Sequence, residues 1–364
     1  MKGKIAVLPG DGIGPEIVAE GVKVLEAVSH KYSHEFSLNY ADVCGIAIDK
    51  HGTSLPDETM RLCRDSDAIL FGAGGGPKWD YPGVKEYSGA ALLRLRKQFG
   101  LFANLRPVKV FPEMENCSPV KPELVKGVDL LVLRENNGGV YYGEPKKQWQ
   151  TEEGRMGVDT MSYSEHEIER IVRAGFELAR SRRKKLCSVD KANVLQVSQL
   201  WRQIANELQQ EYPDVELSHA YADACTMWLI RQPRDFDVLV MANLFGDIIS
   251  DEASVLAGSL GMLPSAQLAG SGTTGEKVFG LYESAHGSAP KHAGKNDANP
   301  IATIFSVSMM LKYSFGLVEE EKCIEKAVQK TLGTYRTYDI MEEGKTKVGT
   351  KEMGDLIVEA IATA

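Results

Sequence analysis

Long apolar runs, paired cysteines and an excess of basic residues are all missing from this sequence. No stretch of about 18 apolar residues occurs, so we expect no membrane-spanning helix. The 42 lysines and arginines are outnumbered by 50 aspartates and glutamates, which gives a formal net charge of −8. A general nucleic-acid or membrane-surface binder needs a surplus of positive charge, so we expect neither class of partner.

The six cysteines are scattered and form no CxxC pair. In a chain of this length we interpret them as reduced thiols of a cytoplasmic protein. The opening MKGKIAVLPGDG lacks the apolar segment of a signal peptide, which agrees with that location. Internal repeats, low-complexity tracts and Pro/Gly/Ser-rich linkers are also absent, and a length of 364 residues favours two domains or one large α/β unit.

Short β-rich runs alternate with helical patterns along the chain. Residues 4–8 (KIAVL) predict a buried strand and residues 17–28 a helix, with Pro15 in its first turn. Further buried strands are predicted at 68–71 (AILF), 130–133 (LLVL) and 238–241 (VLVM). This alternation is typical of an α/β sheet.

A capping box marks the start of another helix, because Ser164 is followed three residues later by Glu167. The apolar face predicted for this helix carries Ile168, Ile171, Val172, Gly175 and Phe176. The polar segment 144–161 before it leaves two interpretations open, a solvated loop or an arm that pairs with another subunit.

Two glycine-rich turns follow predicted strands. GDGIGP at 10–15 has Pro15 where a dinucleotide fingerprint has its third glycine, so we interpret it first as a tight turn. The glycines of GAGGGP at 72–77 are expected to permit close backbone packing. The loop 283–300 combines small residues with histidine and asparagine, which suits an adenosine-binding loop and equally a plain surface loop.

Asp247 and Asp251, in GDIISDEAS, are the strongest candidates for a metal site. They are four residues apart in a segment that can be helical, so both carboxylates would project from one face. Paired carboxylates of this kind suit Mg²⁺ or Mn²⁺. The alternative is that Asp247 caps the start of a helix.

Three arginines fall near the ends of predicted elements, at positions 96, 106 and 134. Converging guanidinium groups can bind two carboxylates in bidentate fashion, whereas the alternative is that they are surface residues. Lys191 lies among small and polar residues at a strand end, where a lysine can carry protons. Tyr141 follows Arg134 by seven residues, and Asp223 falls at a predicted helix start. Taken singly, each of these three residues is more simply explained as structural.

Six stretches, taken in order, resemble the isocitrate/isopropylmalate group of β-decarboxylating dehydrogenases over nearly the whole chain. They are GDGIGPE at 10–16, LLRLRKQFGLFANLRPVKVF at 92–111, RENNGGVYYGEP at 134–145, VDKANVLQVSQLWR at 189–202, NLFGDIISDEAS at 243–254 and HGSAPKHAGKNDANPIATI at 286–304. Six long motifs in order make the resemblance very specific.

The resemblance implies an isopropylmalate dehydrogenase-like, two-domain α/β/α fold rather than a standard Rossmann fold. Residues 1–101 and 258–364 would form a discontinuous first domain on the cofactor side. Residues 102–257 would form the second, dimerisation domain, with an arm near 144–161. The protein would be a homodimer that shares its active sites between subunits.

Roles for individual residues follow from the same motifs. Tyr141, Lys191 and Asp223 would be catalytic, with Lys191 and Asp223 acting in the partner's site, and Asp223, Asp247 and Asp251 would hold Mg²⁺ or Mn²⁺. The substrate would be bound by Arg96, Arg106, Arg134, Leu92, Leu93 and Val194. The cofactor would contact Ile13, Glu283, His286, Gly287, Ser288, Ala289, Lys291, His292, Asn299, Tyr338 and Asp339.

The implied reaction is metal-dependent oxidative decarboxylation of 3-isopropylmalate to 4-methyl-2-oxopentanoate, a step of leucine biosynthesis, with hydride transfer to NAD or NADP. The same chemistry on another alkylmalate, homoisocitrate or tartrate stays open. One reason is that residues 84–91 depart from the family pattern and place Glu86 upstream of the usual glutamate. A non-catalytic regulatory homologue is the remote alternative.

The second departure concerns the cofactor. NAD-using members of the group carry Asp and Ile directly after HGSAP, whereas this chain has Lys291 and His292. A lysine with an aromatic donor attracts the 2′-phosphate of NADP, and a carboxylate repels it. Tyr338 and Asp339 match a second element of NADP-using members, although Glu342 replaces the arginine that follows it there. We therefore favour NADP.

Overall fold

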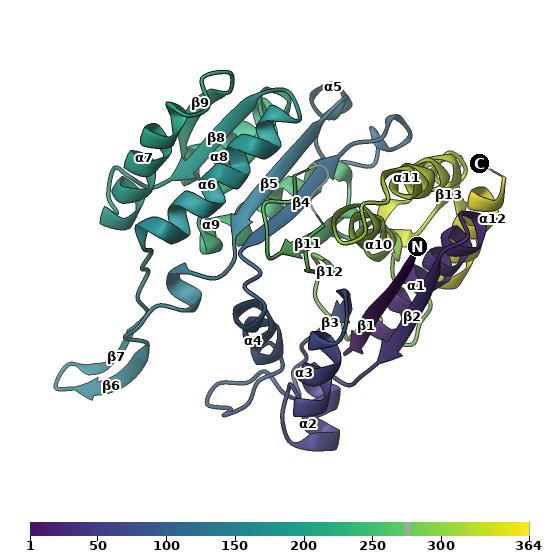
Figure 1. Cartoon of the computed structure of the whole chain (residues 1–364), viewed down its shortest axis with the longest axis horizontal. Helices are drawn as coiled ribbons and strands as arrows, with labels where there is room; N and C mark the ends of the chain where they lie inside the picture. Colours follow the sequence, from purple (N-terminus) through teal and green to yellow (C-terminus); the bar gives the residue numbers. More distant parts are fainter. Residues whose placement is uncertain (274–276, 364) are drawn as a thin grey trace.

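The computed structural model describes residues 1–273 and 277–363. The first domain predicted over 1–101 and 258–364 includes positions 274–276 and 364, which lie outside the described residues. Two small sheets accompany one large central sheet with helices on both of its faces (Figure 1). The predicted mixed α/β class is therefore confirmed.

Ten strands among the described residues form the central sheet, in the order β2-β1-β3-β12-β11-β4-β5-β10-β8-β9. Their bounds are β1 Lys2–Gly10, β2 Glu35–Tyr40, β3 Ala68–Ala73, β4 Ala103–Lys109, β5 Asp129–Glu135, β8 Lys185–Asp190, β9 Glu216–Tyr221, β10 Val238–Met241, β11 Pro264–Leu268 and β12 Gly280–Ser284. The buried strands predicted at 4–8, 68–71, 130–133 and 238–241 are all confirmed within β1, β3, β5 and β10.

The middle of the sheet is where its strand direction changes. β11 runs antiparallel to both β12 and β4, and β4 runs antiparallel to β5, whereas the outer neighbours are parallel. Within the central sheet, the described strands of residues 1–101 and 258–364 lie on the β11 side, and those of 102–257 lie on the β4 side. The sheet is continuous across this junction, and the division into two domains stays a prediction.

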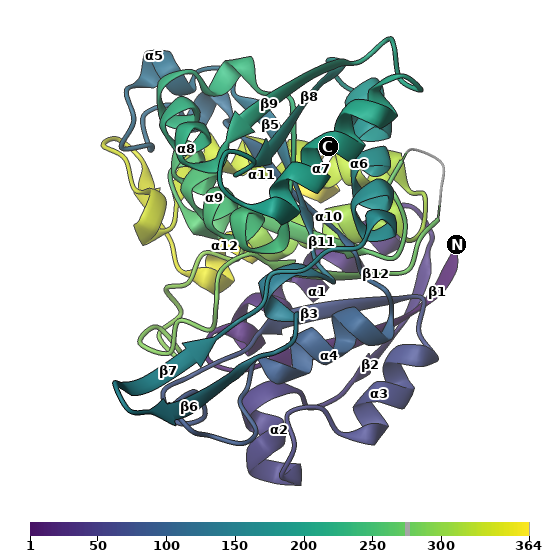
Figure 2. The same ribbon diagram turned by 90° about the vertical axis from the view of Figure 1, so that its left-hand side faces the viewer.

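Helices cover the sheet because successive strand residues bury opposite faces. Around β1 and β3, Ile5, Val7 and Leu70 pack with α1 on one side, while Leu8 and Phe71 belong to the cluster of α2–α4 on the other. The α-helices are α1 Gly14–Lys31, α2 Cys44–His51, α3 Asp57–Arg64, α4 Ala90–Gln98, α5 Pro122–Val125, α6 Glu165–Arg180, α7 Gln196–Gln209, α8 Ala222–Arg231, α9 Asn243–Ser254, α10 Ile301–Tyr313, α11 Val318–Leu332 and α12 Thr350–Ala362. Figure 2 shows α2, α3 and α4 on one side of the β1–β3 layer and α1 on the other.

The remaining elements are short. The 3-10 helices are η1 Pro112–Met114, η2 Gly139–Tyr141, η3 Pro233–Asp235, η4 Val255–Ala257, η5 Leu260–Met262 and η6 Tyr338–Ile340. One of the two small sheets pairs β13 Tyr335–Arg336 with β14 Thr346–Lys347.

The local signals at two helix starts are also confirmed. Pro15 lies in the first turn of α1, where a missing backbone N–H does no harm. At α6, the Ser164 side chain accepts a hydrogen bond from the Glu167 N–H, and the Glu167 carboxylate accepts one from the Ser164 N–H. The predicted apolar face of α6 is buried.

The turn at 10–14 packs closely against other segments of the chain. Gly12 has φ +59°, and a Cβ added there would lie 2.0 Å from the Ser288 carbonyl oxygen. The carboxylate of Asp11 is buried and accepts hydrogen bonds from the N–H groups of Gly45 and Gly75 at 2.9 Å each. This one carboxylate therefore joins the start of α1, the start of α2 and the glycine turn at 72–77.

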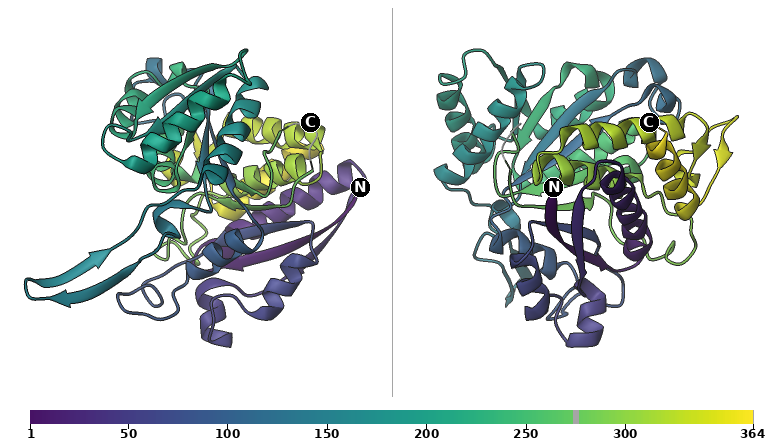
Figure 3. Two further views of the ribbon diagram at one scale, coloured as in Figure 1. Left: turned by 60° about the vertical axis from the view of Figure 1, so that its left-hand side comes forward. Right: turned by 45° about the vertical axis from the view of Figure 1, so that its right-hand side comes forward.

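Segment 144–161 contains a two-stranded antiparallel hairpin, β6 Lys147–Thr151 and β7 Gly154–Val158. The hairpin projects away from the body of the protein (Figure 3). Trp149 and Met156 are exposed on it at 38% and 50%. The hairpin therefore has the shape of the predicted arm and not that of an irregular loop. The pairing of this arm with another subunit stays a prediction.

The described residues include no helix that is both long and apolar enough to span a membrane. All six cysteines are free thiols, and five of them are buried.

Candidate active site

Three arginines meet at a cavity of about 220 Å³ near the centre of the sheet. Arg96 comes from α4, Arg106 from β4 and Arg134 from β5, and at most 5% of any of them is exposed. The surface interpretation of these arginines is therefore wrong. The carboxylates of Asp247, Asp251 and Glu283 pair with these guanidinium groups, and three converging positive charges can also bind the carboxylates of a ligand.

Neighbouring side chains fix the Arg134 guanidinium in place. Its Nε and Nη2 donate to Oδ1 of Asn243 at 3.0 and 2.7 Å, and its Nη1 donates to the Asp247 carboxylate. Gly246 allows this arginine to lie against α9, because a Cβ there would lie 2.5 Å from Cγ of Arg134. Burial, followed by repulsion from Arg106 and Arg96, lowers the pKa of Arg134. A dianionic ligand would relieve that repulsion.

Asp247 and Asp251 lie one turn apart on α9, on the side that faces Arg106. Nη2 of Arg106 is 3.6 Å from Oδ1 of Asp247, and its Nη1 is 3.4 Å from Oδ1 of Asp251. The N-cap of α9 is Ala242, so the alternative that Asp247 caps the helix is wrong. Burial raises the pKa of Asp251, whereas at Asp247 burial is outweighed by Arg134 and Arg106, which lower its pKa. Two hard carboxylate donors on one helix face fit part of the coordination shell of Mg²⁺ or Mn²⁺.

Tyr141 lies in η2 beside the same aspartate. Its hydroxyl donates to Oδ2 of Asp247 at 2.8 Å, and its ring centre lies 5.7 Å from the Arg134 guanidinium carbon. Burial and then the Asp247 hydrogen bond raise the pKa of Tyr141. The phenol therefore keeps its proton at neutral pH, as a proton donor must.

Lys191, Asp223 and Val194 do not line this cavity. Nζ of Lys191 lies 2.7 Å from Oδ1 of Asp223, and this lysine is the first cause that lowers the pKa of Asp223. The Asp223 side chain is 69% exposed and Val194 is 65% exposed. Within the described part of the chain, no three His, Cys, Asp or Glu side chains gather to hold a metal. One chain therefore brings together the arginines, Tyr141, Asp247 and Asp251, and presents Lys191 and Asp223 elsewhere.

Of the residues predicted to form an apolar pocket, only Leu92 is among the described residues that line the cavity, and the pocket stays a prediction. Leu92 lines the cavity, and the carbonyl of Leu93 accepts a hydrogen bond from the Tyr142 hydroxyl at 3.3 Å. Glu86 is engaged elsewhere, because its Oε1 accepts from the backbone N–H and the hydroxyl of Ser54 at 2.8 and 2.6 Å. Burial raises the pKa of Glu86, but the hydrogen bonds from Ser54 and Thr53 and the charge of Arg94 together outweigh burial and lower that pKa. No carboxylate from the 84–91 segment lines the cavity among the described residues.

The loop predicted to hold the cofactor packs on the glycine turn of α1. The N–H of Ile13 donates to the Ser288 carbonyl at 2.9 Å, and His286 and Gly287 line the arginine cavity. Burial lowers the pKa of His286, which keeps its imidazole neutral. Ala289 has a positive φ of 39°, in the turn before Lys291.

The second part of the predicted cofactor site consists of Lys291, His292 and Tyr338. The rings of His292 and Tyr338 stack with centroids 5.2 Å apart, and the His292 Nδ1 lies 3.1 Å from the Asp297 carboxylate. Lys291 is exposed beside them. Small residues, a stacked aromatic pair and an exposed lysine fit an adenosine phosphate.

Asp339, another predicted cofactor contact, and Glu342, which replaces the arginine of the NADP pattern, are both bound by protein side chains. The Asp339 carboxylate accepts hydrogen bonds from Ser259 at 2.5 Å and from Asn299 at 3.1 Å. Glu342 accepts from Asn116 at 2.9 Å and lies 3.6 Å from Arg336.

Several side chains that support the site were missed in the sequence. Asn243 holds Arg134, Ser250 accepts from Nη1 of Arg106 at 2.6 Å, and Gln267 accepts from Nε of Arg96 at 2.7 Å. Asn243 and Ser250 flank Asp247 in the motif and could have been found by their spacing on α9. Gln267 lies in β11, where no motif marked it.

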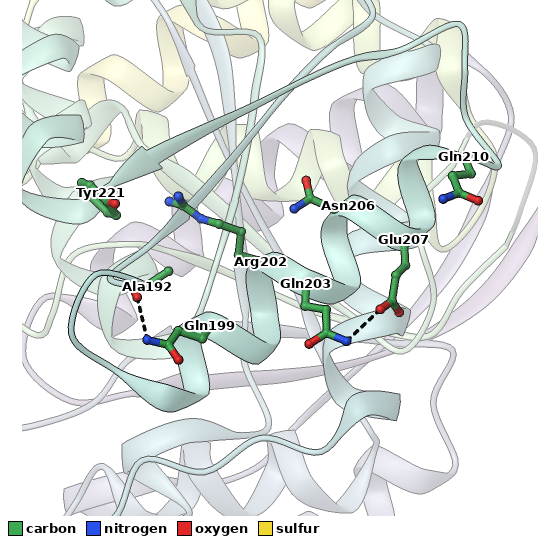
Figure 4. Close-up of a pocket in the computed structure, with 8 residues that line it drawn as sticks. All are labelled: Ala192, Gln199, Arg202, Gln203, Asn206, Glu207, Gln210 and Tyr221. Atoms are coloured by element: carbon green, nitrogen blue, oxygen red, sulfur yellow. Dashed lines mark hydrogen bonds between the residues drawn. The ribbon is translucent and has the colours of Figure 1, made fainter.

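A second hollow, of about 580 Å³, lies on α7 (Figure 4). It is an open surface groove lined by Gln199, Gln203, Asn206 and Gln210, with Arg202 and Tyr221 at one end. Gln199 and Gln203 already bond within the protein, to the Ala192 carbonyl and to Glu207. Arg202 of this groove is paired with Asp190, so the groove does not bring several guanidinium groups together as the arginine cavity does.

Comparisons with known proteins show which family and which solved fold the chain resembles. A model of the family described as isocitrate/isopropylmalate dehydrogenase matches residues 4–357. A 3-isopropylmalate dehydrogenase of Dehalococcoides mccartyi is 56% identical over 363 residues, covering 99% of this chain and 100% of that protein. One from Aquifex aeolicus is 55% identical over 359 residues, covering 98% and 97%. The solved structure of isocitrate dehydrogenase from Methylococcus capsulatus has a TM-score of 0.85 and 34% identity, covering 98% of this chain and 99% of that one.

Proposed function

The chain belongs to the isocitrate/isopropylmalate dehydrogenase family, and from this premise we propose that it oxidatively decarboxylates 3-isopropylmalate to 4-methyl-2-oxopentanoate in leucine biosynthesis. Relatives named 3-isopropylmalate dehydrogenase share more than half of their residues with it over the full chain. The observation that carries the proposal is one cavity in which three buried arginines face Tyr141 and Asp247, with Leu92 in the wall.

The arginines provide the binding energy for a diacid. Their guanidinium groups bind the two carboxylates and hold C2 and C3 of the substrate in a fixed orientation. Leu92 gives the isopropyl group an apolar contact. A third carboxylate, as in isocitrate, would meet this apolar side chain instead of a polar partner.

The proton transfers are assigned to residues of two subunits. Asp247 and Asp251 would hold a divalent metal, which would supply Lewis-acid polarisation, and a bound nicotinamide would supply the hydride acceptor. Lys191 of the partner subunit, with its Asp223, would assist removal of the proton of the 2-hydroxyl group. After CO₂ has left, Tyr141 donates its proton to C3, and its raised pKa keeps that proton available until then.

A homodimer is part of the proposal. Lys191, Asp223 and Val194 belong to the predicted set but do not line the cavity of one chain, so a second copy would complete each site. Met227, Trp228 and Ile248 are large apolar side chains exposed on α8 and α9, and Trp149 and Met156 are exposed on the hairpin. Both regions suit burial against a second copy.

For the cofactor we propose NADP in preference to NAD, and Mg²⁺ or Mn²⁺ as the metal. Lys291 offers a positive charge at the loop where a 2′-phosphate would lie, and the stacked His292 and Tyr338 offer an aromatic surface and ring donors. The six free thiols support a reducing compartment, and we place the protein in the cytoplasm.

A panel of 2-hydroxy diacids tests the proposed function. Initial rates are measured with 3-isopropylmalate, other 3-alkylmalates, homoisocitrate, isocitrate and tartrate, each with NAD and NADP and with Mg²⁺, Mn²⁺ or EDTA. We expect the highest kcat/KM with 3-isopropylmalate and no turnover in EDTA. Because Glu86 is held by Ser54 and contributes no carboxylate to the cavity, other alkylmalates are the second candidates. A higher kcat/KM for homoisocitrate or tartrate would overturn the substrate assignment.

A further inference from the structure

The Gln267 side chain is the centre of a buried hydrogen-bond network behind the cavity. Its Oε1 accepts from Nε of Arg96 at 2.7 Å and from Nδ2 of Asn136 at 2.9 Å. Its Nε2 donates to the Glu283 carboxylate. Neither Gln267 nor Asn136 is exposed, so solvent cannot replace these bonds.

This network spans the antiparallel junction of the sheet. Gln267 lies on β11, opposite Asn104 of β4 on one side and Leu281 of β12 on the other. Asn136 directly follows β5, Glu283 belongs to β12, and Arg96 belongs to α4 (Figure 1). One amide therefore connects elements from both sides of the junction.

The amide can satisfy these partners in one orientation only. Its oxygen faces two donors and its nitrogen faces a carboxylate, so a flipped amide would oppose donor to donor and acceptor to acceptor. Because Nε of Arg96 is engaged by Gln267, a substrate carboxylate is met by the Nη groups of that arginine. Nη2 of Arg96 is also 3.7 Å from Oε1 of Glu283, so without the amide the guanidinium is free to turn towards that carboxylate.

We propose that Gln267 is a positioning residue that keeps Arg96 directed at the diacid and separate from Glu283. Its amide gives the arginine an uncharged acceptor on the side away from the cavity. Donation from Nε2 occupies the oxygen of Glu283 that the arginine would otherwise approach. This inference rests on the proposed function, because it gives Arg96 its task.

The test compares three variants with the wild type. Gln267→Met keeps the length of the side chain and removes all three hydrogen bonds. Gln267→Glu keeps the acceptor for Arg96 and Asn136, and when protonated it also keeps a donor towards Glu283. The matched control is Gln209→Met, because Gln209 is a partly buried glutamine on α7 that donates to the Tyr212 and Val215 carbonyls and lies outside the cavity.

Dissociation constants for 3-isopropylmalate and for NADP are measured by titration calorimetry, together with kcat, KM and thermal unfolding. We expect Gln267→Met to raise the diacid dissociation constant by about tenfold or more, the effect of losing a buried hydrogen bond to a charged group. Gln209→Met should lower the unfolding temperature without changing either dissociation constant.

The Gln267→Glu variant adds a readout that general destabilisation does not produce. Charged groups that face position 267 are Arg96 from α4 and Glu283 from β12, with Arg106 and Arg134 acting on Glu283 from β4 and β5. The introduced carboxyl group and Glu283 would titrate as a pair. Below the pKa of this pair, the protonated side chain at position 267 reproduces the amide pattern, so diacid affinity should approach the wild-type value. Above it, affinity relative to wild type should fall.

The outcomes separate this inference from the proposed function. If Gln267→Met folds and binds the diacid as tightly as wild type, the inference is overturned and the function stands. If Gln267→Met does not fold, Gln267→Glu decides, and a pH-independent ratio to wild type overturns the inference. A wild-type protein that binds no diacid of the panel overturns both.

Discussion

The hydroxyl of Tyr141 donates to Oδ2 of Asp247 across 2.8 Å, while Oδ1 of the same carboxylate faces Arg134 and Arg106. The aspartate therefore orients a protonated phenol at the centre of a cationic cavity. This arrangement places the proposed proton donor next to the carboxylate proposed as a metal ligand. Binding and proton delivery are thus coupled through one side chain.

The first prediction concerns Tyr141→Phe. Removing the hydroxyl removes the proposed proton donor to C3, so kcat should fall by about 10²- to 10⁴-fold, the usual contribution of general acid catalysis. KM for the diacid should change far less, because the arginines remain. Steady-state kinetics measure both values, with Tyr335→Phe as a control distant from the cavity. A kcat within twofold of wild type would exclude Tyr141 as the donor.

The second prediction tests the metal site through Asp251→Asn. Loss of one carboxylate should raise the Mn²⁺ concentration for half-maximal activity by about tenfold or more. The matched control is Glu252→Gln, which removes one negative charge at the neighbouring position of α9. It should leave the Mn²⁺ concentration for half-maximal activity unchanged. Direct Mn²⁺ binding followed by electron paramagnetic resonance provides a measurement independent of turnover. Equal affinities in the two variants would contradict the assignment.

The third prediction concerns the pH dependence of stability without metal. Burial raises the pKa of Asp251 in the folded protein, so its contribution to stability is fully present below the unfolded pKa and is lost as pH rises through the folded pKa. In EDTA, Asp251→Asn should therefore gain stability relative to wild type as pH increases across that range. Thermal unfolding at a series of pH values measures the difference. A constant difference between the two proteins would show that Asp251 is not responsible.

The fourth prediction addresses cofactor choice. Lys291→Asp replaces the cation by an anion at the proposed 2′-phosphate position, so the ratio of kcat/KM for NADP to that for NAD should fall by about tenfold or more. Lys295→Asp makes the same charge change in the same loop and should shift the ratio much less. A wild-type enzyme that prefers NAD strongly would already refute the NADP proposal.

The fifth prediction tests the shared site. Lys191→Met and Asp247→Asn should each be inactive as pure proteins. When they are mixed, unfolded and refolded together, heterodimers should contain one intact site, which restores roughly a quarter of the wild-type sites for random pairing. Activity that never exceeds the sum of the separate variants would show that each chain builds its own complete site.

Much of the fold was predictable because its signals are local. Buried strands such as 130–133 and the capping box at Ser164 depend on side chains close in sequence, and both were confirmed. The structure of segment 144–161 was harder to predict, because the strands of a projecting hairpin do not alternate apolar and polar residues as half-buried strands do. Its strands are held by backbone hydrogen bonds of their own pair.

The sequence by itself determined the family and the identity of the charged residues, since six ordered motifs contain the arginines, the aspartates of α9, Tyr141 and Lys191. Only the tertiary structure decided how these charges are balanced. Asn243 and Gln267 lie 109 and 171 positions away from the arginines they hold, and their hydrogen bonds depend on strand order and register, which no short pattern encodes. The separation of Lys191 and Asp223 from the cavity is likewise a property of the folded chain, because it depends on where β8 and α8 lie relative to α9.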